Sequence, residues 1–127
     1  MRPGLFDRPT STSRHGPIVE RSYKRSNGPR TLRYKVLEVD GEPVDIEGGY
    51  IEHTSWCTVE GIVAVGFTVR GPPGVAGIYI LQVDGTDQIL ARICDFKPRP
   101  GNWNGSLLTA CEVQWDAATK TKRPFGR

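Results

Sequence analysis

Apolar and polar residues alternate with a period of two along most of this chain, and glycine or proline interrupts the alternation at short intervals. In "IVAVGFTVR" the side chains of Val63, Val65, Phe67 and Val69 fall on one face, and "GPPG" at 71–74 then breaks the run. This period is typical of a half-buried β-strand, and no helical periodicity persists for two turns. The chain has 15 glycines and 10 prolines among 127 residues, which favours short strands joined by turns. We therefore expect an all-β protein.

Similar runs fill residues 31–116: "TLRYKVLEV", "YIEHTSWCTV", "VAGIYILQV", "QILARICDF" and "LLTACEVQW". The sequences "DGEP" at 40–43 and "DGTD" at 84–87 are typical of tight turns between strands. A shift in the alternation predicts a bulge near Val36. These runs predict about seven short strands in a small antiparallel sandwich or a partly open barrel.

The last two segments of this region carry tryptophans. We expect "LLTACEVQW" to be a single closing strand, with Leu107, Cys111, Val113 and Trp115 on one side. "KPRPGNWNGS" before it is expected to be a long loop. Its Trp103 either folds back over the core or is offered to a partner, and the sequence leaves both open.

The segment "HTSWC" at 53–57 gathers several reactive side-chain types. In a strand, His53, Ser55 and Cys57 share one face with neighbours about 7 Å apart, too far for a direct nucleophile–base hydrogen bond. We therefore interpret it as an ordinary strand and expect no catalytic residue, metal or cofactor. One alternative stays open, a small β-barrel enzyme or metal-binding protein that uses His53, Cys57 and Cys94.

The three cysteines, Cys57, Cys94 and Cys111, are widely spaced and form no CxxC motif. A disulfide scaffold normally has more cysteines, in pairs. We expect three reduced and mostly buried thiols.

Charge is segregated along the chain. Residues 1–35 hold nine Lys/Arg and two acids, residues 36–118 hold four and twelve, and residues 119–127 hold four and none. The net charge of +3 therefore hides an acidic body between two basic ends.

The composition of the ends predicts three parts. Residues 1–30 are rich in Arg, Pro, Ser and Gly, and their few apolar residues predict a flexible basic arm. Residues 31–116 form the β domain, and residues 117–127 form a basic tail. We expect the β domain to stay folded when residues 1–29 are removed.

We expect the basic ends to contact nucleic acid or another polyanion, because Lys and Arg neutralise phosphates. The candidate contact residues are Arg14, Arg21, Lys24, Arg25, Arg30, Lys120, Lys122 and Arg123. A block of acids is expected to form a face for the arm or for a partner. Its members are Glu38, Asp40, Glu42, Asp45 and Glu47.

A basic arm ahead of a compact β domain resembles the layout of many small viral coat and matrix proteins, in which the arm touches genome or membrane and the β domain assembles. This layout predicts a non-enzymatic assembly or binding protein, viral structural or accessory, that forms a homo-oligomer. The alternative is an OB-like domain that binds single-stranded nucleic acid on its sheet, which the body's acidic charge disfavours. The chain has no apolar run of about 18 residues and no secretory signal, so we expect an intracellular, non-secreted protein. A location in a virus particle stays open. Peripheral contact with a membrane stays open.

Overall fold

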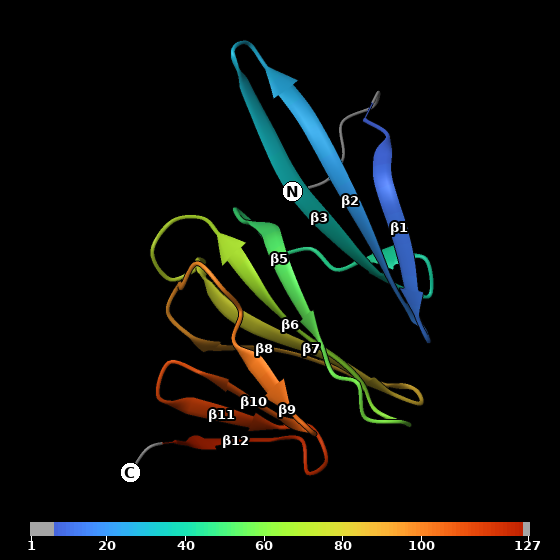
Figure 1. The fold of residues 1–127 in the computed structure, drawn as a ribbon, viewed down its shortest axis with the longest axis vertical. Helices are drawn as coiled ribbons and strands as arrows, with labels where there is room; N and C mark the ends of the chain where they lie inside the picture. The colour runs from blue at the N-terminus through green and yellow to red at the C-terminus, as the bar shows by residue number, and fades with distance from the viewer. Residues whose placement is uncertain (1–6, 126–127) are drawn as a thin grey trace.

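A computed structural model describes residues 7–125 as two antiparallel β-sheets, and these residues include no helix (Figure 1). The larger sheet contains β1 (Pro9–His15), β2 (Ile18–Asn27), β3 (Arg30–Val39), β4 (Glu42–Pro43), β5 (Tyr50–Trp56), β6 (Val63–Arg70), β7 (Gly77–Asp84) and β8 (Asp87–Cys94). The smaller sheet contains β9 (Asn102–Asn104), β10 (Leu107–Ala110), β11 (Val113–Asp116) and β12 (Thr121–Pro124). The all-β prediction is confirmed, and neither sheet closes into a barrel. The described part of the chain has no helix long and apolar enough to cross a membrane.

The order of strands in the larger sheet is β1-β2-β3-β5-β6-β7-β8, with β4 beside β3. The predicted turns at 40–43 and 84–87 join β3 to β4 and β7 to β8. Asp40 and Gly41 both have positive φ, at 51° and 83°, as a tight hairpin turn of this kind requires.

The bulge predicted near Val36 is absent, because β2 and β3 pair without a register shift from Ile18–Val39 to Asn27–Arg30. The alternation changes there because both faces of β3 are covered. Leu37 and Val39 face one core, while Tyr34 and Val36 face a separate cluster with Tyr23.

Only one residue pair, Lys35 with Ile51, joins β3 to β5. Even so, β2 and β3 contribute to the same core as β5, β6 and β7. This first core contains Ile18, Leu37, Val39, Ile51, Val65, Phe67, Val69, Tyr79, Leu81 and Val83.

The opposite face of β6, β7 and β8 packs against the smaller sheet. This second core contains Ala64, Ile78, Ile80, Ile93, Leu108, Ala110, Trp115 and Ala117. Trp103 belongs to its edge: the indole Nε1 donates a hydrogen bond to Ser55 O at 2.8 Å. Trp103 therefore folds back over the body, one of the two possibilities that the sequence left open.

The structure differs from the expected flexible arm, because residues 9–27 form β1 and β2. Few residues there are apolar, but Ile18, Val19 and Tyr23 are placed where the strand pairing buries them, at 0%, 6% and 8% exposure. In the same way, residues 121–124 of the expected tail pair with β11 as β12. Residues 1–6 and 126–127 of the expected arm and tail lie outside the described residues.

The prediction of one strand over "LLTACEVQW" is wrong, since β10 and β11 form a hairpin. Cys111 and Glu112 make its turn, and Cys111 has a φ of 58°. The expected loop before it contains the short strand β9. Together with β1, β2 and β12, these elements raise the number of strands to twelve in the described residues, above the about seven expected.

The prediction of three reduced thiols is also wrong. Cys94 at the end of β8 and Cys111 in the β10–β11 turn form a disulfide, with 6.6 Å between their Cα atoms. They lie 17 residues apart in sequence, and only the packing of the two sheets brings them together. Cys57 is free and half-buried.

Candidate polyanion-binding surface

The distal halves of β2 and β3 form a two-stranded ribbon that extends past its neighbours (Figure 1). β1 pairs with β2 only as far as Tyr23, and β5 pairs with β3 only at Lys35. In the described sheet, residues 24–33 therefore pair only with each other. Gly28, with a φ of 62°, permits the two-residue turn at the tip.

One face of the ribbon, together with the residue pair at its base, carries only cations and hydroxyl groups. Residues directly opposite each other in an antiparallel pair share a face. The pairs on this face are Ser22 with Lys35, Lys24 with Arg33, and Ser26 with Thr31. We call these six side chains the hydroxyl–cation face.

Lys24 and Arg33 are the notable pair of this face, because like charges directly opposite each other are destabilising. Both side chains are exposed, and neither has an acidic partner among residues 7–125. Arg30, beside the turn, is exposed and equally without an acidic partner in that part of the chain. A bound anion would relieve this repulsion.

Lys35, at the inner end of the face, is held by a half-buried carboxylate. Its Nζ donates hydrogen bonds to Glu20 Oε2 and Ser22 Oγ, both at 2.9 Å. Glu20 also accepts from Thr54 Oγ1 at 2.5 Å and from Trp56 Nε1 at 2.9 Å. Burial alone would raise the pKa of Glu20, but the hydrogen bonds from Thr54, Lys35 and Trp56 outweigh it and lower the pKa. Glu20 is thus ionised. Its carboxylate oxygens already accept hydrogen bonds from Lys35, Thr54 and Trp56.

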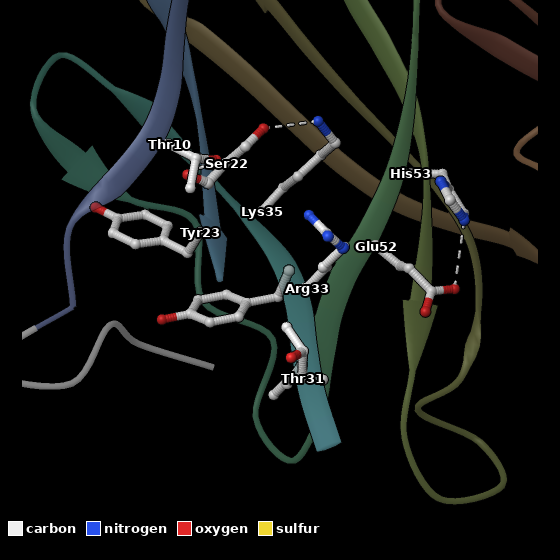
Figure 2. A pocket seen from close by; sticks show the side chains of 10 residues that line it. Thr10, Ser22, Tyr23, Thr31, Arg33, Lys35, Glu52 and His53 are labelled. Carbon is white, nitrogen blue, oxygen red and sulfur yellow. Dashed lines mark hydrogen bonds and ion pairs between the residues drawn. The ribbon is translucent and has the colours of Figure 1, made fainter. Parts of the chain in front are cut away.

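A hollow of about 510 Å³ lies along this part of the ribbon (Figure 2). Its lining includes Ser22, Thr31, Arg33 and Lys35 of the hydroxyl–cation face. Glu52 lines it from β5, but both of its oxygens accept hydrogen bonds from Arg70 Nε at 2.8 Å. The hollow is therefore lined by cations and hydroxyl groups and by Glu52, whose negative charge is already compensated by Arg70.

No known family matches this chain. Comparisons with protein-family models, curated proteins and solved structures gave no match.

On the opposite face of β2 and β3, Arg21 and Arg25 are compensated by acids, whereas Arg30 lies on this face without one among residues 7–125. Arg21 Nε bonds Glu38 Oε2 at 3.0 Å, and Arg25 bonds Asp7 Oδ2 at 2.7 Å. The hydrogen bond to its carboxylate partner raises the pKa of each arginine. Both residues were predicted to contact a polyanion, and in the structure both are engaged within the chain.

Tyr34 anchors this compensated face. Its hydroxyl donates a hydrogen bond to Asp7 Oδ2 at 2.6 Å, and its ring stacks on that of Tyr23. Burial, followed by the hydrogen bond to Asp7, raises the pKa of Tyr34 to about 12. Tyr23 and Tyr34, at the base of the ribbon, thus lie on the face opposite the hydroxyl–cation face, and both also line the hollow.

The remaining predicted basic contacts are scattered. Arg14 is exposed on β1 and pairs with Val19, on the compensated side of the sheet. Lys120 forms an ion pair with Asp84. Lys122 is exposed on β12, and Arg123 donates hydrogen bonds to the side-chain oxygen of Gln114.

Within residues 7–125, the predicted acidic face meets the basic region in the Arg21–Glu38 pair. The other members lie around the β3–β4 turn and the connection to β5. They are Asp40, Glu42, Asp45 and Glu47, all exposed.

Of the predicted cations, Lys24, Arg25 and Arg30 belong to the ribbon, with Lys24 alone on the hydroxyl–cation face, and sequence reasoning missed Arg33. The signal was the alternation in "ERSYKRSN", which separates Lys24 from Arg21 and Arg25. An interpretation of residues 1–30 as an arm concealed that period of two.

His53, Cys57 and Cys94 do not converge. Cys94 is in the disulfide, Cys57 Sγ lies 3.5 Å from Gly105 O, and His53 Nε2 lies 3.6 Å from Glu52 Oε1. Residues 7–125 contain no group of three or more His, Cys, Asp or Glu side chains placed to hold a metal ion.

Proposed function

We propose that this chain is a non-enzymatic binding and assembly protein, and that its hydroxyl–cation face binds nucleic acid. The observation that carries the proposal is the exposed, directly opposed pair of Lys24 and Arg33, which no acid among residues 7–125 compensates. Two like charges directly opposite each other destabilise the fold, and a phosphate bound between them removes this repulsion. Ser and Thr hydroxyls beside them add hydrogen-bond donors for phosphate oxygens.

Electrostatic binding of this kind depends steeply on salt. Neutralising phosphates on a duplex releases condensed counterions, with a slope of log affinity against log salt of about −0.9 per phosphate. Contacts from Lys24 and Arg33, the two uncompensated cations of the hydroxyl–cation face, therefore predict a slope of about −2.

Anisotropy of a fluorescent oligonucleotide over a salt series tests the proposal. The double variant Lys24→Ala/Arg33→Ala should flatten the slope by about 2, because two phosphate contacts are lost. The matched control is Lys97→Ala/Arg99→Ala, which removes two exposed cations from the β8–β9 connection and should leave the slope unchanged. No binding at low salt, or equal losses in both variants, would contradict the proposal. Anionic vesicles added as a competitor in the same assay test the alternative of a membrane surface. Vesicles that displace the oligonucleotide would favour a membrane over nucleic acid.

We also propose self-assembly, in keeping with the coat- or matrix-like role that the sequence layout suggests. β1 and β8 are the outer strands of the described larger sheet, and outer strands carry backbone groups open to pairing. Measuring the mass in solution with and without nucleic acid tests this. A monomer under both conditions would leave a binding protein without an assembly role.

A further inference from the structure

We infer that the ribbon of residues 24–33 enters the major groove of duplex DNA and lays the hydroxyl–cation face against the base edges. This inference rests on the proposed function and names the form of nucleic acid. Two paired strands lie about 4.8 Å apart, and a major groove about 12 Å wide admits a two-stranded ribbon. Four residue pairs beyond the neighbouring strands give a projection of about 13 Å, longer than the groove is deep.

The side chains of the face match the groups in that groove. Arg and Lys donate to guanine O6 and N7, and Ser and Thr bond to several base edges. Arg33 and Lys24 form the middle of the face, and Ser26 and Thr31 lie next to the tip. The turn itself is Gly28–Pro29, which places no bulky side chain at the leading end.

The same ribbon suits other nucleic acids poorly. Proteins that bind single strands stack bases on exposed aromatic rings, whereas Tyr23 and Tyr34 are 8% and 1% exposed and lie on the opposite face. The major groove of an RNA duplex is too deep and narrow for side chains to read.

The test uses the full chain and three probes of equal length: duplex DNA, single-stranded DNA and duplex RNA. We expect duplex DNA to bind about tenfold more tightly than the others, the value of one good base-edge contact. Dimethyl sulfate then reports the groove, because it methylates guanine N7 in the major groove and adenine N3 in the minor groove. The bound protein should protect guanine N7 and leave adenine N3 reactive.

Lys24→Ala/Arg33→Ala should abolish the N7 protection, and Lys97→Ala/Arg99→Ala should keep it. Where the first variant does not fold, the footprint of the unmodified chain decides alone. Equal affinity for all three probes, unprotected N7 or protected N3 would overturn the groove inference and leave nucleic-acid binding standing. No binding to any probe would instead overturn the proposed function.

Discussion

Gln82 joins the two sheets through a buried side chain that is 3% exposed. Its Nε2 donates to Ala117 O at 2.7 Å, and its Oε1 accepts from Trp115 Nε1 at 2.9 Å. Gln82→Leu would leave both partners buried without a hydrogen bond, which costs about 1–3 kcal/mol for each unsatisfied group. For two such groups we predict a loss of about 2–6 kcal/mol in the free energy of unfolding, measured by chemical denaturation.

The control for this change is Gln88→Leu, on the exposed side of the adjacent strand β8. It should shift the denaturation midpoint little. Equal effects of the two substitutions would show that the buried hydrogen bonds contribute nothing of their own.

Glu20 makes the stability of the fold depend on pH. Its pKa is lowered in the folded state, so its contribution is present above the ordinary value of 4.5 and is lost as pH falls through the folded value. Glu20→Gln should therefore destabilise the protein near neutral pH, and the difference from the unmodified protein should shrink in acid. Denaturation at a series of pH values measures it, with the exposed Glu47→Gln as control. A difference that stays constant from neutral pH into acid would contradict this role of the carboxylate.

At the scale of elements, the Cys94–Cys111 disulfide ties the edge of β8 to the β10–β11 turn. A bridge across 17 residues contributes about 3 kcal/mol in the chain-entropy account. The Cys94→Ser/Cys111→Ser variant should lose stability of about this size, measured by denaturation under non-reducing conditions.

A thiol titration of the denatured protein checks the pairing directly. Before reduction the only reactive thiol should be Cys57, and after reduction all three cysteines should react. Cys57→Ser should remove the signal seen before reduction. Three reactive thiols in the unreduced protein would restore the expectation drawn from sequence spacing.

At the scale of the whole molecule, the first 29 residues are part of the body. Their removal deletes β1 and β2 and uncovers Leu37 and Val39, which are 0% and 7% exposed. We therefore predict that the truncated chain loses cooperative thermal unfolding, the reverse of what the sequence alone suggested. Circular dichroism during heating measures it, with full-length Lys24→Ala/Arg33→Ala as a control for the loss of charge. A cooperative transition in the truncated chain would favour the original boundary.

The strands that the sequence predicted best are those with the strongest local signals. Residues 63–70 alternate clearly and lie between turns, and Gly85 supplies the positive φ of the β7–β8 turn. The β3 half of the ribbon was predicted, but β2 was missed because its residues 20–27 are mostly charged or hydroxyl-bearing, and such residues are equally typical of an unstructured arm. Period alone identifies a strand only when one of its faces is apolar.

The sequence by itself determined the all-β class, the main turns and the excess of positive charge near the N-terminus, because each depends on neighbouring residues. Only the tertiary structure decided which charges are free. Lys24 and Arg25 are adjacent in sequence but point to opposite faces, and Asp7 reaches Arg25 from 18 residues away while Lys24 meets Arg33. The disulfide depends in the same way on two sheets packing together. Contacts between distant residues follow from how the strands stack, and no local pattern of residue types records that.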